Sequence, residues 1–174
     1  MARLSKDDYY LNIAKAVSLR STCLRRCYGA ILVKNKEIIA TGYNGAPRGA
    51  VNCCDTGFCA RDAENAPHNK DYLDTCPSIH AETNCLLNVR RQDAVGSTLY
   101  LYGYDHKTEK PVVPAEPCVM CKRLLQNCGV ARVVGYGAQE QYYDFLDAVT
   151  DAAGQISEDE ELVIKLRDAL SKTN

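Results

Sequence analysis

Two short motifs carry residues that commonly bind metal ions: HAE at 80–82 and PCVMC at 117–121. A helix that begins near Pro117 would place Cys118 and Cys121 on one face of its first turn, where the helix dipole and free N–H groups favour thiolates. A neutral His80 at the start of another helix would add a nitrogen ligand. Three such ligands leave the fourth tetrahedral position of a zinc ion open for water, as catalytic zinc sites require.

Glu82 is two residues after this histidine, at the same predicted helix start. Two thiolates cancel the formal charge of zinc, so the ion would acidify its water less than it would in a site of three histidines. A nearby base then becomes useful. Glu82 can take a proton from the water and pass it to a ring nitrogen and then to a leaving amine. The pattern therefore favours hydrolytic deamination of an amidine-like ring carbon.

These motifs match the H-x-E and P-C-x-x-C signature of zinc deaminases. From about Ser18 to Gly135 the chain resembles the cytidine and deoxycytidylate deaminase family. Two further stretches look like the deoxycytidylate branch: STCLRR at 21–26, which leads into GAILV at 29–33, and TGYNGAPRG at 41–49. The resemblance implies hydrolysis of dCMP to dUMP with release of ammonia, in which a zinc-bound hydroxide attacks C4 and Glu82 moves the protons.

The resemblance also assigns roles to single residues. It makes Glu82 the acid–base catalyst, Asn44 a ligand of the sugar, and the backbone around Ala81 a reader of the pyrimidine edge. The residues that match the catalytic zinc ligands of the family are His80, Cys118 and Cys121.

The phosphate of a nucleotide needs a cationic partner. Arg91 is at the position where some family members have a phosphate-binding arginine, and Arg26 and Arg48 are the next candidates. Paired arginines at the end of a helix also commonly face solvent and complement the helix dipole, so both interpretations of Arg91 remain open.

Ten cysteines are present, and most of them are clustered. Without a signal peptide, such clusters more often bind metal or do chemistry than form disulfides. Four of them would make a closed structural zinc site that fixes the irregular segment at about 44–79. The resemblance supplies two of the four, spacing supplies the other two, and the alternative is a set of unlinked reduced thiols. The four expected ligands are Cys23, Cys53, Cys59 and Cys76, with Cys54 and His68 as substitutes.

Length and charge restrict the class of protein. With 174 residues, the chain fits a single domain over 1–174. Its 21 basic and 22 acidic residues give a net charge of −1, which favours a small substrate over polymeric nucleic acid. No apolar run is long enough to span a membrane, and the first residues lack the apolar segment of a secretory signal. We therefore expect a cytoplasmic protein without membrane contact.

Helical and strand-like patterns alternate along the chain and predict an α/β fold, a three-layer α/β/α arrangement like that of cytidine deaminases, with a mixed sheet of about five strands. Helices are expected at 5–20, 80–91, 117–128, 142–153 and 157–171, and strands at 29–33, 38–43, 98–104 and 131–135. The charged residues KNKE at 34–37 predict the turn of a hairpin.

Several alternatives remain open at the level of sequence. The segment between Leu101 and Pro117 is longer than in the simplest family pattern, and its Tyr102, Tyr104 and His106 could stack on a base or only form a longer loop. The substrate could be cytidine, a tRNA adenosine or a pterin-like ring, although tRNA would favour a basic surface. A non-catalytic zinc protein would have no need for Glu82. The resemblance further implies a homo-oligomer, commonly a hexamer, and regulation by dCTP and dTTP near residues 42–49.

Overall fold

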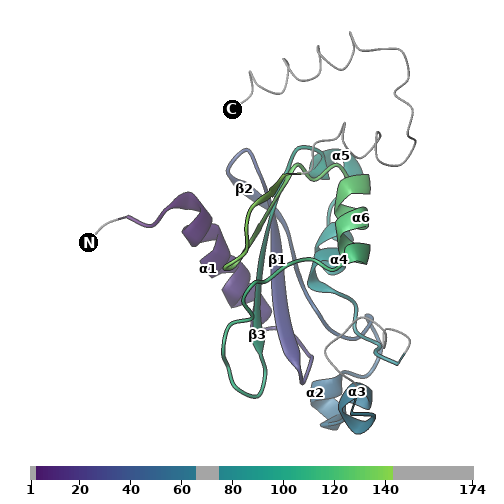
Figure 1. Ribbon diagram of the computed structural model, residues 1–174. Coiled ribbons are helices and arrows are strands. Elements are labelled where there is room, and N and C mark those ends of the chain that lie inside the picture. Colours follow the sequence, from purple (N-terminus) through teal and green to yellow (C-terminus); the bar gives the residue numbers. More distant parts are fainter. Residues whose placement is uncertain (1–2, 66–74, 143–174) are drawn as a thin grey trace. The chain divides into compact units, whose positions relative to one another are not determined.

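The computed structural model describes residues 3–65 and 75–142, and these belong to one compact unit that comprises residues 1–142 (Figure 1). The helices expected at 142–153, apart from Tyr142, and at 157–171 lie outside the described residues, so a single domain over 1–174 stays a prediction. The strands are β1 (Arg26–Lys34), β2 (Glu37–Tyr43), β3 (Thr98–Asp105), β4 (Arg132–Gly135) and β5 (Gln141–Tyr142). The helices are α1 (Lys6–Ser18), α2 (Cys53–Thr56), α3 (Ala60–Ala63), α4 (Ala81–Leu86), α5 (Arg91–Ala94) and α6 (Val119–Asn127).

The strands form one five-stranded sheet in the order β2-β1-β3-β4-β5. β1 pairs antiparallel with β2 and with β3, β3 and β4 run parallel, and β5 adds a two-residue antiparallel edge. The hairpin predicted at KNKE is present, and its two turn residues, Asn35 and Lys36, have φ of 52° and 68°, as a tight two-residue hairpin turn requires. The predicted mixed α/β sheet is confirmed.

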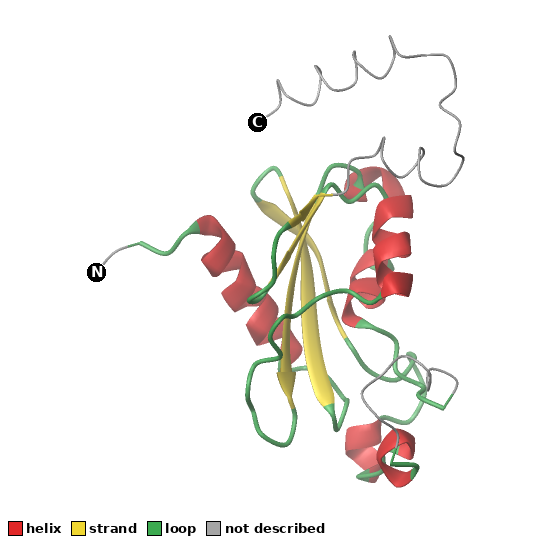
Figure 2. Ribbon diagram, in the orientation of Figure 1, coloured by secondary structure: helices red, strands yellow, loops and turns green. Residues whose placement is uncertain are grey.

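Helices cover both faces of the sheet, which makes three layers (Figure 2). On one face, Tyr10 and Ala14 of α1 are buried in a hydrophobic cluster with Ile31, Val33 and three side chains of β3 and β4. On the other face, α4 lies so close to β2 that a Cβ added at Gly42 would collide with the backbone of α4. Since side chains alternate along a strand, the even-numbered residues of β1 face away from α1.

The helix predicted over 80–91 is wrong in its extent: α4 ends at Leu86, and a separate α5 begins at Arg91. Asn88 gives a physical reason for the break. Its Nδ2 donates a hydrogen bond of 2.9 Å to the carbonyl of Thr41 in β2, and such side-chain bonds compete with a continuing helix. Arg90 then takes an extended conformation and precedes the first turn of α5.

The irregular segment after β2 holds two short helices, α2 and α3, which the sequence did not predict. Within the described part of the chain, no helix has the length and apolarity of a membrane span.

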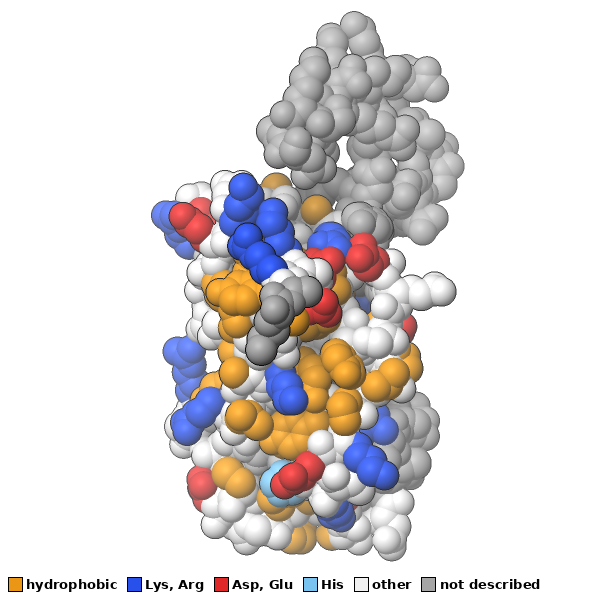
Figure 3. Space-filling model, turned by 90° about the vertical axis from the view of Figure 1, so that its left-hand side faces the viewer, with side chains coloured by type: hydrophobic (Ala, Val, Ile, Leu, Met, Phe, Trp, Pro, Cys, Tyr) orange, Lys and Arg blue, Asp and Glu red, His pale blue; other side chains and the backbone are white. Residues whose placement is uncertain are grey.

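The face that carries α1 shows hydrophobic side chains across its middle, between basic and acidic groups (Figure 3).

An ion pair joins the start of α1 to the sheet. Arg132 of β4 donates to both carboxylate oxygens of Asp7, at 3.0 and 2.7 Å, and the Tyr100 hydroxyl donates to the same carboxylate at 2.7 Å. The hydrogen bond from Arg132 lowers the pKa of Asp7. A lowered pKa in the folded state means that the stabilisation is present above the ordinary pKa of Asp and is lost as the pH falls through the lowered value.

We expect Asp7→Asn to lower the free energy of unfolding at pH 7 by about 1 kcal/mol, since the pair is bidentate but partly exposed. The loss should shrink at acidic pH, as the pH falls through the lowered pKa of Asp7 and its carboxylate becomes protonated. Asp8→Asn is the matched control, because Asp8 shares the first helical turn with Asp7 and therefore the helix-dipole effect. Urea unfolding at both pH values measures the difference, and equal losses for the two variants would refute the contribution of the ion pair.

Candidate metal centre and active site

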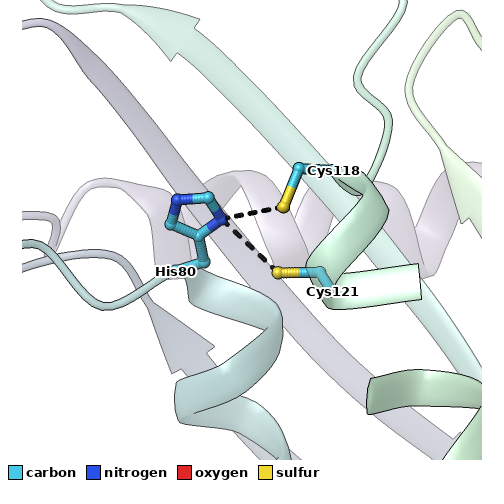
Figure 4. A group of neighbouring side chains, drawn as sticks. All are labelled: His80, Cys118 and Cys121. Carbon is cyan, nitrogen blue, oxygen red and sulfur yellow. Dashed lines mark hydrogen bonds between the residues drawn. The ribbon is translucent and has the colours of Figure 1, made fainter. Parts of the chain in front are cut away.

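The starts of two helices bring His80, Cys118 and Cys121 together (Figure 4). His80 is the N-cap residue of α4, Cys118 is the N-cap residue of α6, and Cys121 is in the first turn of α6. His80 Nδ1 is 3.5 Å from Cys118 Sγ and 3.4 Å from Cys121 Sγ. A tetrahedral zinc ion, with bonds of about 2.1 Å to nitrogen and about 2.3 Å to sulfur, would separate such atoms by roughly 3.6 Å. The three atoms therefore fit one zinc ion.

The electrostatics of this cluster also favour a cation. Hydrogen bonding with Cys121, and then with His80, lowers the pKa of Cys118 to about 3. The same contact with Cys118 raises the pKa of Cys121, because a second thiolate beside the first is unfavourable. Hydrogen bonding to Cys118 raises the pKa of His80. A divalent cation would remove the repulsion between the two thiolates.

Glu82 lies beside this cluster in the first turn of α4, and its side chain is 4% exposed. Burial raises the pKa of its carboxyl group, and a hydrogen bond to Cys121 opposes that shift. A raised proton affinity makes a carboxylate better suited to accept a proton from water and to return it to a substrate.

His80, Glu82 and Cys118 line a cavity of about 560 Å³, and Cys121 is buried beside them. Its lining includes four arginines, Arg25, Arg26, Arg61 and Arg123, against two glutamates, Glu82 and Glu116. The arginines outnumber the glutamates, so these side chains give the lining a net positive charge, whereas the whole chain has a net charge of −1. The cavity is therefore suited to an anionic ligand.

Three of the other residues predicted to contact the substrate line the cavity: Asn44, Ala81 and Arg26. The Asn44 amide also joins neighbouring segments: its Oδ1 accepts hydrogen bonds from Tyr28 N and Ser21 Oγ, both at 2.7 Å, and its Nδ2 donates to the Arg26 carbonyl. Asn44 thus holds the start of β1 in place on the cavity wall.

Arg91 and Arg48 are not among the residues that line the cavity. Arg91 Nε donates to the carbonyl of Asn127 at the end of α6, at 3.2 Å, and Arg48 donates to Asn88 Oδ1 at 2.8 Å. The role predicted for Arg91 in binding phosphate therefore has no support from this geometry.

The four cysteines expected to hold a second zinc, Cys23, Cys53, Cys59 and Cys76, all line the same cavity. Cys53 interacts electrostatically with Cys59 and Cys76, and Cys23 interacts with Cys76. Among the described residues, however, His80, Cys118 and Cys121 form the one group whose ligand atoms all lie within 4.8 Å of one another. Of the two substitutes, Cys54 is exposed and His68 lies outside the described residues.

Some residues of the cavity were not found from the sequence. Tyr28 was missed because the strand was expected to begin at Gly29, whereas β1 begins at Arg26. With the correct start, alternation would have placed Tyr28 on the face opposite α1. Arg61 belongs to α3, and the irregular composition around it gave no signal. Tyr102 and Tyr104, which were considered for base stacking, pack instead with the cluster under α1.

Comparison with known proteins agrees with this geometry. The family model described as the cytidine and deoxycytidylate deaminase zinc-binding region matches residues 4–136. Deoxycytidylate deaminase of Mycobacterium phage D29 is 40% identical over 138 residues, which cover 77% of this chain and 96% of the phage protein. The deoxycytidylate deaminase of Schizosaccharomyces pombe is 38% identical over 132 residues, or 76% of this chain but 37% of the yeast protein.

The solved structures include a similar fold. The crystal structure of dCMP deaminase from the cyanophage S-TIM5, in complex with dCMP and dUMP, has a TM-score of 0.51 and 26% sequence identity. The likeness covers 76% of this chain and 82% of the cyanophage chain.

Proposed function

The chain belongs to the cytidine and deoxycytidylate deaminase family, and on this basis we propose that it hydrolyses dCMP to dUMP and ammonia. The observation that carries the proposal is the convergence of His80 Nδ1, two cysteine sulfurs and a buried carboxylate at the wall of a cavity rich in arginine. The names of the phage relatives, and the dCMP and dUMP bound in the cyanophage structure, support this substrate.

His80, Cys118 and Cys121 would hold the zinc ion. When bound, zinc supplies Lewis acidity and lowers the pKa of a water molecule. Glu82 accepts a proton from the attacking water and delivers it to N3 of the cytosine ring. It then takes the proton of the new hydroxyl group at C4 and gives it to the amine, which leaves as ammonia while the C4 carbonyl forms. Because Glu82 is buried, it exchanges protons with the substrate rather than with bulk solvent.

The arginines of the cavity supply the charge that a 5′-phosphate needs. We propose that Arg26, which lines the cavity, takes the phosphate-binding role, and that Arg91 does not. Asn44 and the backbone at Ala81 are proposed contacts of the sugar and the base, because both line the same cavity. A homo-oligomer, regulation by dCTP and dTTP, and a cytoplasmic location stay predictions.

An assay of ammonia release from dCMP, deoxycytidine, CMP, dAMP and dGMP tests the function, with Glu82→Ala as the blank. We expect kcat/KM for dCMP to exceed that for deoxycytidine by about 10- to 100-fold, since a charge-assisted hydrogen bond contributes about 1.5–3 kcal/mol. Arg26→Ala should reduce this ratio, whereas Arg91→Ala should leave it unchanged. A preference for a purine nucleotide, or no ammonia from any cytosine compound, would refute the proposal.

We also propose a second, structural zinc held by Cys23, Cys53, Cys59 and Cys76, because all four line one cavity. Metal analysis of carefully prepared protein should find two zinc ions per chain, and Cys53→Ser should leave one and lower the melting temperature. Cys128→Ser, at the end of α6, is the control and should retain both ions. One zinc per chain that Cys53→Ser does not change would exclude the second site.

A further inference from the structure

The ring of Tyr28 rests on a glycine of the neighbouring strand. In the register of β1 and β3, Tyr28 lies opposite Gly103. A Cβ added at Gly103 would collide with Cδ1 and Cε1 of the Tyr28 ring. The ring therefore lies directly on the backbone of β3, as aromatic residues do beside strand glycines, and it cannot retreat further into the sheet.

Two hydrogen bonds with Asn44 fix the backbone of the same residue. The amide nitrogen of Tyr28 donates to Asn44 Oδ1 at 2.7 Å, and its carbonyl accepts from Asn44 N at 3.2 Å. A half-buried ring that lies on the neighbouring strand, and whose own backbone is hydrogen-bonded through both N–H and C=O, has little freedom to move aside when a ligand enters.

Tyr28 shares the cavity with His80 and Glu82. Burial raises the pKa of Tyr28, and the negative charge of Glu82 adds to this effect. The side chain is therefore a neutral phenol within electrostatic range of the carboxylate that moves protons. A base whose reacting carbon is at the metal centre would share this cavity with the ring.

We infer that Tyr28 is a specificity-determining residue: its ring, seated on Gly103, is the wall against which a single pyrimidine ring stacks, and it leaves too little room for a fused two-ring base. This inference rests on the proposed function, because it takes the ligand to be a cytosine nucleotide. Stacking on an aromatic ring tolerates any planar base, so the selection comes from the fixed position of the wall.

Steady-state kinetics of the zinc-loaded protein test this role. Tyr28→Ala should raise KM for dCMP about tenfold and change kcat less than about threefold, because stacking acts mainly on binding. Tyr28→Phe keeps the ring and should keep the wild-type KM within about threefold. The inhibition constant of dGMP, divided by the KM for dCMP, should be lower in Tyr28→Ala than in the wild type. Tyr28→Leu, which fills the seat without an aromatic face, should raise KM as Tyr28→Ala does.

Gly103→Ala completes a double-mutant cycle. In the presence of Tyr28, the added methyl group should push the ring into the cavity and raise KM for dCMP. In the Tyr28→Ala background the same change should have no further effect on KM, because the atoms that it would meet are gone. Zinc content and melting temperature, measured for every variant, separate this result from a loss of folding.

A folded, zinc-loaded Tyr28→Ala or Tyr28→Leu protein with the wild-type KM would overturn the inference, as would an equal effect of Gly103→Ala in both backgrounds. Calorimetric titration of dCMP, run in parallel, keeps the two proposals apart. Wild-type protein that binds dCMP but releases no ammonia would refute the proposed function, while the dependence of dCMP affinity on Tyr28 would still decide the role of this residue.

Discussion

Replacing Glu82 with glutamine will lower kcat for dCMP by about 10²- to 10⁴-fold while the zinc content stays at the wild-type level. Glutamine keeps the size and polarity of the buried side chain but cannot accept a proton. Because Glu82 is proposed to move protons to N3 and to the amine, both transfers lose their carrier. KM should change much less than kcat, since the loss occurs in the transition state.

Glu116→Gln is the matched control for this experiment. Glu116 is the second carboxylate that lines the cavity, but its Oε2 is 4.0 Å from Lys122 Nζ, in a partly exposed ion pair. This substitution removes the same charge from the cavity without removing the proposed proton carrier, so kcat should remain close to that of the wild type. If the two variants lost activity equally, the charge of the cavity rather than proton transfer would explain the effect.

Replacing Cys121 with serine will release the zinc ion of the active site and reduce ammonia release to the level of the Glu82→Ala blank. The side chain is buried and contacts both His80 and Cys118, so one histidine and one thiolate would remain as ligands. One histidine and one thiolate do not hold zinc strongly without a third protein ligand. Zinc content and turnover should therefore fall together, and zinc added to the variant should not restore turnover.

Two controls distinguish loss of the ion from loss of the fold. Cys128→Ser, in the same part of the chain, should keep both zinc and activity. Wild-type protein dialysed against a chelator should lose turnover and regain it when zinc is returned. Full activity in metal-free wild-type protein would contradict a zinc-dependent reaction.

The sequence was most informative where chemistry and local structure coincide. Cys118 and Cys121 are three residues apart at a helix start, and His80 precedes another helix, so their convergence could be expected from spacing and from the resemblance together. The hairpin at KNKE and the order of strands and helices followed from alternation and turn chemistry. In these places short-range rules and the final packing agree.

The rest depended on long-range contacts. The helix ends after Leu86, where Asn88 donates a hydrogen bond to the carbonyl of Thr41 in β2, 47 residues earlier in the chain. Arg61 reaches the cavity from an irregular segment whose path no periodicity describes. The place of Tyr28 depends on the register between β1 and β3, which puts Gly103 under its ring. No local pattern contains this information.

The most direct test of the account is a crystal structure of the zinc-loaded protein with an anomalous difference map at the zinc absorption edge. We predict a peak about 2.1 Å from His80 Nδ1 and about 2.3 Å from both Cys118 Sγ and Cys121 Sγ, with the carboxylate of Glu82 beside it. If zinc were found at the other cysteines and not at these three atoms, the proposed catalytic centre would be wrong.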